Sequence, residues 1–300
     1  MESIIKDMDY DYLSYKKAIR LLCENYPFLM SDVIGKSVGG RDIISLKIGR
    51  SEEYVLLCAA FHGSEHITAN LLLKFTENLC SSLAEGTPLC GYDIRSVMTG
   101  RGVIIIPVVN PDGVEISLHG TDAAGYMRDF AARICKGNHE LWNANLRGVD
   151  INHNFDADWE TVKQNEREAG IYTPSMTRFG GYKPESEPET QALVELCNSY
   201  KIRHAVAFHS QGEVIYADTG GEKIPRMQKM AEILSTSCGY AIEKPEKIAT
   251  SGGFKDWFIR CFHRPAFTVE IGKGKNPLPT DSIKEIYTHL EDMLILSLAM

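Results

Sequence analysis

The sequence lacks any long apolar run, any concentrated basic stretch and any recognisable export signal. No apolar stretch approaches the ~18 residues that a membrane-spanning helix needs, so no membrane span is expected. Residues 1–11 mix acidic residues with short apolar pieces and contain no basic region followed by an apolar core, which argues against secretion and favours a cytoplasmic protein. The net charge of −8 and the absence of a basic stripe argue against nucleic acid or an anionic membrane as a partner.

Closely spaced cysteines and linkers are missing as well. The eight cysteines include no Cys-x-x-Cys pair, which favours reduced thiols in a protein without an export signal, although an even count would also allow disulfides. With 300 residues, 44% hydrophobic and 24% charged, the composition is that of a soluble enzyme with one large core. We therefore expect a single catalytic domain at residues 34–300, with residues 1–33 forming an N-terminal helical segment packed on it.

Hydrophobic periodicity alternates between helical and strand patterns along the chain. The expected helices lie at 10–26, 66–82, 188–200, 224–237 and 281–298, and the expected strands at 43–48, 54–61, 103–109, 204–208, 213–217 and 266–271. Continuous apolar strands between helices indicate an α/β fold with a mixed, mostly parallel twisted sheet covered on both faces. Ser186 and Glu189 form a capping-box pattern at the start of the helix at 188–200. The segment 113–178 is expected to be rich in loops and to build a cleft.

Two apolar segments end in residues that bind zinc in enzymes. The run at 54–61 is followed directly by His62 and Glu65, and the run at 204–208 is followed by His209. In open α/β sheets ligands collect beyond the carboxyl ends of the strands, so these three side chains are expected to meet. Two imidazoles and a carboxylate, with a fourth position left for water, suit catalytic zinc. The sequence therefore predicts one Zn²⁺ ion at these residues, although a lone histidine in a folded domain is more often structural.

A further acidic residue, Glu270, lies within the apolar and aromatic run at 264–272. A carboxylate among buried residues is costly unless it is paired or functional. Burial also raises the pKa of a carboxylate toward the range that suits a general base. Beside a zinc site, Glu270 would take a proton from the attacking water and pass it to the leaving amine. The alternative is a glutamate at a strand edge that faces solvent.

Polar residues within the segment 142–155 offer further candidates. Arg147 would polarise a scissile carbonyl and stabilise its oxyanion, unless it is simply a solvated surface charge. Asn152, His153 and Asn154 would hold a substrate carboxylate, or would merely shape a turn. The pattern alone leaves both interpretations open for each of these residues.

The order of these residues resembles that of the zinc carboxypeptidase family, and within it the γ-D-glutamyl-diaminopimelate peptidases that act on bacterial cell-wall peptides. The resemblance extends from about residue 34 to residue 279. It is carried by Ile34-Gly-Lys-Ser-Val-Gly-Gly-Arg-Asp42, His62-Gly-Ser-Glu65, Pro107-Val-Val-Asn-Pro-Asp-Gly113, Gly148-Val-Asp-Ile-Asn-His-Asn-Phe155, Ser186-Glu-Pro-Glu-Thr190, His209-Ser-Gln-Gly-Glu213, Ser251-Gly-Gly-Phe-Lys-Asp-Trp257 and Thr268-Val-Glu-Ile-Gly272. The narrower likeness to the cell-wall branch rests on the segments 142–147, 209–213 and 276–279.

The resemblance implies a role for each residue that matches a family motif. The zinc ligands of the family correspond to His62, Glu65 and His209, and its general base corresponds to Glu270. The oxyanion arginine corresponds to Arg147, and the asparagine that binds the substrate carboxylate corresponds to Asn152. The implied fold is that of the zinc carboxypeptidases, and the implied partner is a peptide substrate, such as a cell-wall muropeptide.

Three departures from the family pattern bear on specificity. His153 stands where the family typically has arginine, so a permanent charge is replaced by an imidazole that is largely neutral at pH 7. The tyrosine that closes over substrate in many members corresponds to a position near Ile248 in this sequence, which has no hydroxyl. A tyrosine that is typical of the cell-wall branch is replaced by Phe254. Lys255 aligns with the specificity pocket, where a lysine favours an anionic group on the leaving residue. We expect Lys255, Asn152 and His153 to bind a diaminopimelate carboxylate, unless Lys255 points to solvent.

The function that the sequence predicts is zinc-dependent hydrolysis of the γ-D-glutamyl–diaminopimelate bond in peptidoglycan stem peptides. One alternative is a carboxypeptidase or deacylase of the same fold that acts on another acidic peptide or amino acid derivative. A second alternative is a non-catalytic peptide-binding protein on this scaffold. Such a protein would be expected to lack a zinc ligand or the base, and this sequence lacks neither.

Overall fold

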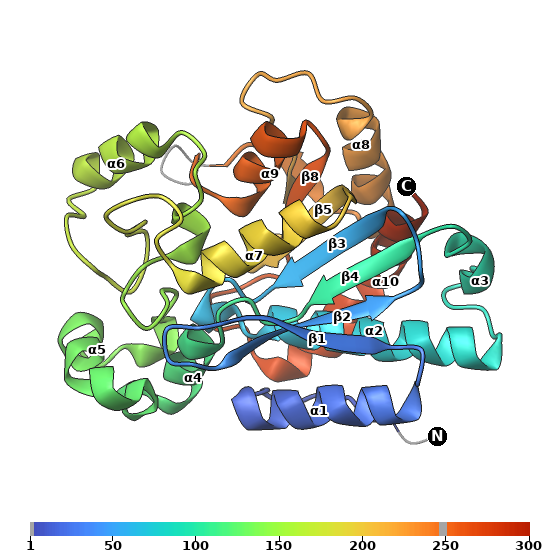
Figure 1. Cartoon of the computed structure of the whole chain (residues 1–300), viewed down its shortest axis with the longest axis horizontal. Coiled ribbons are helices and arrows are strands. Elements are labelled where there is room, and N and C mark those ends of the chain that lie inside the picture. The colour runs from blue at the N-terminus through green and yellow to red at the C-terminus, as the bar shows by residue number, and fades with distance from the viewer. Residues whose placement is uncertain (1–2, 246–250) are drawn as a thin grey trace.

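The chain folds around one mixed β-sheet, and the computed structural model describes residues 3–245 and 251–300. The strands follow the order β1-β2-β4-β3-β5-β8-β6-β7 across the sheet (Figure 1). Their bounds are β1 Met30–Lys36, β2 Asp42–Ile48, β3 Tyr54–Ala59, β4 Gly102–Ile106, β5 Ile202–His209, β6 Val214–Tyr216, β7 Ala241–Glu243 and β8 Ala266–Glu270. The central strands β4, β3, β5 and β8 run parallel, whereas β1, β2 and β6 join the sheet through antiparallel pairs.

The central strands are buried on both faces. Every residue of β3 and of β4 is buried, as a parallel strand covered by helices requires. The edge strand β7 is exposed along its whole length, and β1 at the other edge contains no fully buried residue. The predicted α/β class, the mostly parallel centre of the sheet and the covered faces are confirmed.

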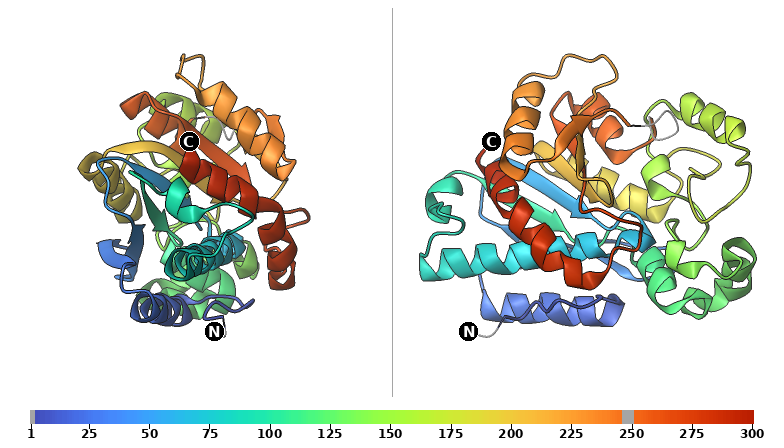
Figure 2. Two further views of the ribbon diagram at one scale, coloured as in Figure 1. Left: turned by 90° about the vertical axis from the view of Figure 1, so that its right-hand side faces the viewer. Right: turned by 180° about the vertical axis from the view of Figure 1, so that it is seen from behind.

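Helices cover the sheet on both sides. Their bounds are α1 Tyr12–Asn25, α2 Ile67–Glu85, α3 Ile94–Val97, α4 Pro111–His119, α5 Arg128–Cys135, α6 Trp159–Glu168, α7 Pro188–Ser199, α8 Met227–Cys238, α9 Phe254–Phe262 and α10 Ile283–Ala299. Helices α2, α8 and α10 lie on one face and α7 on the other (Figure 2). Buried side chains of α1 belong to the same hydrophobic core as the sheet.

The segment 113–178 is rich in loops, as predicted, and also contains the end of α4 and helices α5 and α6. One prediction about local structure is wrong. Helix α7 has Glu187 at its N-cap, and no side chain caps it, so the capping box predicted for Ser186 and Glu189 is wrong. The carboxylate of Glu189 instead turns into the interior and accepts hydrogen bonds from the Val38 N–H (3.0 Å) and from the Asn145 side-chain amide (3.1 Å). Hydrogen bonds from Val38 and Asn145, which are distant in the sequence, therefore take the place of the local cap.

The buried carboxyl group of Glu189 predicts a pH-dependent stability. Burial, aided by the nearby Asp112 and opposed by the two hydrogen bonds, raises the pKa of Glu189 from 4.5 to about 7. The folded protein therefore holds this proton more tightly than the unfolded chain, so the stabilisation is complete below pH 4.5 and is lost as the pH rises to about 7. Replacing Glu189 with glutamine removes the titration, and the unfolding free energy of the variant relative to wild type should rise by about 3 kcal/mol between pH 4.5 and pH 8.

Urea unfolding of both proteins at pH 4.5 and at pH 8 measures this difference. Glu195→Gln provides the control, because Glu195 lies on the same helix and is exposed. An unchanged difference between the Glu189→Gln variant and wild type at the two pH values would contradict the prediction.

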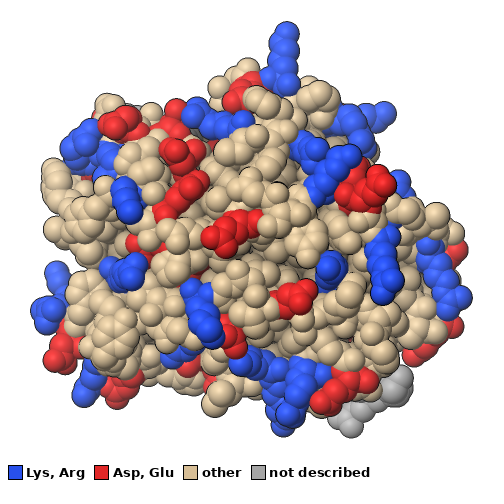
Figure 3. Space-filling model, viewed as in Figure 1, with Lys and Arg blue, Asp and Glu red and all other residues tan. Residues whose placement is uncertain are grey.

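The structure pairs none of the eight cysteines, all of which are free thiols. Among the described residues, no helix combines the length and the apolar character that a bilayer crossing demands. Acidic and basic side chains are interspersed on the face in Figure 3, without a continuous basic stripe there.

Candidate active site

The turn that follows β3 places His62 at the N-cap of a short 3₁₀ helix, Gly63–Glu65, and Glu65 at its last residue. A side chain at Gly63 would collide with the Gly113 and Trp142 carbonyl oxygens, because its Cβ would lie 2.2 and 2.4 Å from them. Only glycine therefore allows this turn to pack so closely against its neighbours. The turn is thus packed tightly at the point where it presents the two side chains.

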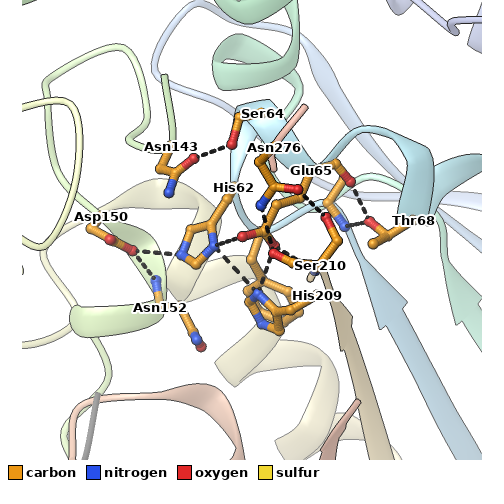
Figure 4. A network of polar contacts seen from close by, with 12 residues as sticks. His62, Ser64, Glu65, Thr68, Asn143, Asp150, Asn152, His209, Ser210 and Asn276 are labelled. Atoms are coloured by element: carbon orange, nitrogen blue, oxygen red, sulfur yellow. Dashed lines mark hydrogen bonds and ion pairs between the residues drawn. The ribbon is translucent and has the colours of Figure 1, made fainter. Parts of the chain in front are cut away.

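The side chains of His62, Glu65 and His209 converge beyond the ends of β3 and β5 (Figure 4). The Nδ1 atoms of the two histidines lie 3.3 Å apart. The Glu65 carboxylate lies 2.8 Å from Nδ1 of His62 and 3.0 Å from Nδ1 of His209. One ligand atom from each residue falls within 4.8 Å of the others, which is the spacing of a metal-binding group. The predicted convergence of these three residues is found.

The electrostatics of this group favour a bound cation. Burial alone lowers the pKa of His62, but the Glu65 and Asp150 carboxylates outweigh it and raise the pKa well above its ordinary value. Burial likewise opposes ionisation of Glu65, yet the two histidines lower its pKa to about 2. The site is therefore built to stabilise positive charge between carboxylates. Two imidazoles and one carboxylate fit zinc, which binds nitrogen and oxygen ligands of this kind.

A second group of potential metal ligands lies between the start of α1 and helix α4. Asp11, Glu115 and His119 also gather near one another. Asp11, however, caps the start of α1, and Glu115 accepts a hydrogen bond from the Tyr12 N–H and pairs with Arg41. These carboxylates are engaged in holding α1 against the domain.

Glu270 is placed beside the ligand group by the register of the sheet. In the parallel pair β5–β8 it lies opposite His209. Its neighbours Val269 and Ile271 are fully buried, whereas Glu270 itself is half-buried, so the alternation of β8 places its side chain on the same face of the sheet as His209. Burial and the nearby Glu65 carboxylate raise the pKa of Glu270 well above 4.5, although His62 acts in the opposite sense. A carboxyl group with a raised pKa suits proton transfer.

Asp150 is a member of the site that sequence reasoning missed. Its Oδ1 lies 3.0 Å from Nε2 of His62, on the opposite side of the ring from Glu65. A carboxylate in this position fixes the tautomer and the orientation of a metal-binding histidine. Asp150 is 1% exposed and sits between Val149 and Ile151. Like Glu270, Asp150 is a carboxylate between apolar residues, so the sequence does contain a signal for it.

Asn143 is a second residue that was missed. Its side-chain oxygen accepts a hydrogen bond from the hydroxyl of Ser64, which lies between the two ligands of the turn (2.5 Å). The backbone of the same segment is fixed by the buried Asn110, whose amide donates to the Asn143 and Ala144 carbonyl oxygens. No sequence pattern connects positions so far apart along the chain.

Arg147 and Asn152 have contrasting surroundings. The Arg147 guanidinium pairs with the Glu187 carboxylate at 3.4 Å and remains half-exposed. The Asn152 side-chain oxygen accepts a hydrogen bond from the Phe254 N–H (3.0 Å), while its backbone N–H donates to Asp150. This bond fixes the orientation of the Asn152 amide and leaves its NH₂ group available as a donor.

Comparison with known proteins identifies the chain. The model of the zinc carboxypeptidase family matches residues 15–292. The protein belongs to the zinc carboxypeptidase family. The uncharacterised protein YqgT of Bacillus subtilis is 33% identical over 95% of this chain and 76% of its own length. Gamma-D-glutamyl-L-diamino acid endopeptidase 1 of Lysinibacillus sphaericus is 34% identical over 93% of this chain and 69% of its own.

A solved structure shares the fold. Bovine thrombin-activatable fibrinolysis inhibitor, in complex with tick carboxypeptidase inhibitor, superimposes with a TM-score of 0.76 at 19% identity, covering 98% of this chain and 97% of that one. The family membership establishes a metallopeptidase and implies zinc as its cofactor. The His-Glu-His group is the site that fits the ion.

The residues expected to set specificity in this zinc carboxypeptidase differ in burial and in partners. Burial lowers the pKa of His153, although the Asp150 carboxylate opposes this, so the imidazole is neutral near pH 7. Lys255 is 5% exposed, and its ammonium group donates to the Asp218 carbonyl oxygen (2.7 Å) and pairs with Asp256. Lys255 therefore does not point to solvent. Ile248 lies outside the described residues.

The role of Asp150 leads to a prediction about metal affinity. Replacing Asp150 with asparagine should lower zinc affinity by about 10- to 100-fold. The Asp150 carboxylate accepts hydrogen bonds from both the His62 ring and the Arg178 N–H, one on each oxygen, whereas an amide has only one oxygen to accept them. Competition with a chromophoric chelator measures the affinity. Asp156→Asn is the control, since Asp156 lies in the same segment and is exposed. Equal zinc affinity in the Asp150→Asn variant and wild type would refute this role.

Proposed function

We propose that the protein hydrolyses the γ-D-glutamyl–diaminopimelate bond of peptidoglycan stem peptides. The observation that carries this proposal is the 34% identity, over most of both chains, to an endopeptidase whose name specifies a γ-D-glutamyl-L-diamino acid bond.

In this proposal His62, Glu65 and His209 hold one zinc ion. The bound ion would supply Lewis-acid chemistry at the scissile carbonyl and would lower the pKa of a water molecule. Asp150 keeps the His62 ring in the orientation that ligation needs. Glu270 accepts the proton of the attacking water on its carboxylate and then gives it to the leaving nitrogen.

The remaining polar residues orient the substrate. The NH₂ group of Asn152 donates to a substrate carboxylate, because its oxygen is already engaged by the Phe254 N–H. His153 takes part as a neutral hydrogen-bonding group, in keeping with its lowered pKa. We assign oxyanion stabilisation to Arg147, whose half-exposed guanidinium must then leave its pairing with the buried Glu187 carboxylate when substrate binds.

Lys255 is proposed to recognise the carboxylate that distinguishes diaminopimelate from lysine. Together with Asp158, Asp218, Asp256 and Arg260 it lines a cavity of about 70 Å³ at the start of α9. Such a volume suits a carboxylate group better than a large apolar side chain. The ammonium group has three N–H donors, two of which are used by Asp218 and Asp256. The third is available to the ligand.

The test compares hydrolysis of L-Ala-γ-D-Glu-meso-diaminopimelate with that of its L-lysine analogue by the zinc-loaded protein. We expect preferential cleavage of the diaminopimelate peptide, and a Lys255→Met variant that loses this preference without losing the activity toward the lysine peptide. Lys229→Met, on the exposed face of α8, is the control. Failure to cleave either peptide with zinc bound would reject the substrate, and cleavage of another acidic peptide in the same panel would favour a carboxypeptidase or deacylase.

A further inference from the structure

Asn143 is fastened to the turn that carries two of the candidate zinc ligands. Its side-chain oxygen accepts a hydrogen bond from the Ser64 hydroxyl (2.5 Å), and its backbone carbonyl oxygen accepts one from the Gly63 N–H (3.3 Å). Gly63 and Ser64 are the two residues that stand between His62 and Glu65. Asn143 is therefore tied to the same turn that presents these two side chains to the ion.

The side-chain NH₂ group of Asn143 is the part of the residue that has no partner within the described ranges 3–245 and 251–300. Its backbone N–H donates to the Met176 carbonyl oxygen (2.9 Å), and the Asn110 amide donates to its backbone carbonyl oxygen (3.1 Å). Asn143 is half-buried, and its NH₂ group is turned away from Ser64 to the side of His62 (Figure 4). Two N–H donors are therefore open beside the ligand group.

Amide hydrolysis creates a need for such donors. When water adds to the carbonyl carbon, the C=O double bond becomes a single bond and its oxygen gains negative charge. Donors that are in position before this charge develops stabilise it without first being reorganised. Arg147 must leave Glu187 before it can act on the oxygen, whereas the Asn143 amide is held in place by neutral hydrogen bonds and breaks none of them.

We propose that Asn143 is a catalytic residue whose side-chain NH₂ group donates a hydrogen bond to the scissile carbonyl oxygen as negative charge develops on it. The inference rests on the proposed function, in which an amide is hydrolysed at the His-Glu-His group. Ser64 is then a positioning residue, because its hydroxyl engages the Asn143 oxygen and leaves the nitrogen to face the substrate. Asn143 acts in addition to Arg147 and supplies the donor that needs no rearrangement. The competing role is a purely structural tie between the segment 142–144 and the turn.

Kinetics of the zinc-loaded variants on the diaminopimelate tripeptide separate the two roles. Asn143→Asp keeps an oxygen that accepts from Ser64 but has no N–H to donate, so kcat should fall by about 10²- to 10³-fold with little change in KM. Ser64→Ala frees the amide to rotate and should cause a smaller loss of kcat. Asn138→Asp is the matched control, because Asn138 lies five residues earlier, is exposed and caps nothing with its side chain. It should change neither kcat nor KM.

Calorimetry gives a readout that does not depend on turnover. In one tripeptide analogue a phosphinate and a methylene group replace the carbonyl and the N–H of the scissile amide, so that it carries the tetrahedral, negatively charged centre of the transition state. Asn143→Ala should weaken binding of this analogue by about 100-fold. Binding of the uncleaved tripeptide to the Glu270→Gln protein should be the same with and without Asn143→Ala, since its carbonyl oxygen carries no such charge.

Three results would overturn the catalytic role of Asn143. They are a wild-type kcat in the Asn143→Asp variant, an equal weakening of the analogue and of the uncleaved peptide, and a loss of zinc from the Asn143 variants on metal analysis. The last result would make Asn143 a support of the ligand turn. If wild type does not cleave the tripeptide, the proposed substrate fails instead, and the same comparison is made on the acidic peptide that wild type does cleave.

Discussion

Replacing Glu270 with glutamine is expected to lower kcat on the order of 10³-fold while the protein keeps its zinc. Glutamine preserves the shape of the side chain and its place opposite His209, but it cannot accept and return a proton. The half-buried carboxyl group has a raised pKa, because burial and the Glu65 carboxylate disfavour its charge. The variant therefore cannot take the proton from the attacking water or return it to the leaving nitrogen. The zinc-binding residues His62, Glu65 and His209 are unchanged.

Kinetics on the best peptide substrate, together with metal analysis of the purified variant, check this expectation. Glu243→Gln is a suitable control, because Glu243 lies on the exposed edge strand β7 of the same sheet. Residual activity above about a tenth of wild type would place the general base elsewhere. Loss of zinc from the variant would mean that Glu270 supports the metal site and that its catalytic role is not isolated by this substitution.

Replacing His209 with alanine should weaken zinc binding by at least about 100-fold. Structural zinc sites bind with about 10–16 kcal/mol shared among four ligands, so one ligand contributes roughly 3 kcal/mol. His209 is buried, lies 3.0 Å from the Glu65 carboxylate and stacks on Phe61. No hydrogen bond to another described residue engages its Nε2 atom. The variant therefore loses a ligand and gains a cavity against Phe61.

Chelator competition measures the affinity of the His209→Ala variant, and thermal unfolding with and without zinc gives an independent check. Zinc should raise the Tm of wild type, since it binds only the folded state, but not that of the variant. His289→Ala, an exposed histidine of α10, controls for adventitious binding to imidazole. A variant that retained wild-type zinc affinity would exclude His209 as a ligand.

The sequence was sufficient for the elements whose burial imposes a pattern. Strands β3 and β4 and residues 205–208 of β5 are apolar because helices cover both faces of the sheet there, and their position and class were predicted from that pattern. The edge strands β1 and β7 were missed for the opposite reason. Their residues are largely exposed, so their composition resembles that of a loop. Helix α4 was also missed, although Asn110 caps it and a proline follows at its first turn.

The candidate site divides in a similar way. His62, Glu65, His209 and Glu270 could be predicted because each follows or interrupts an apolar strand, where a polar residue is conspicuous. Contacts between distant segments could not be predicted. Asp150 meets His62 across 88 positions of the chain, and only the fold brings them together. For the same reason the sequence could not reveal that Lys255 is buried beside Asp218 and Asp256.

The pairing of His209 with Glu270 across β5 and β8 limits where the chain tolerates changes in length. Side chains alternate between the two faces of a sheet, so one residue inserted within β8 before Glu270 would turn its side chain to the opposite face from His209. The same insertion in the connection between α9 and β8 could be absorbed without moving either side chain. Deletions and insertions that preserve activity should therefore lie outside the paired residues of both strands, which are 205–209 in β5 and 266–270 in β8. A scan of single-residue insertions through residues 263–272 would locate this boundary.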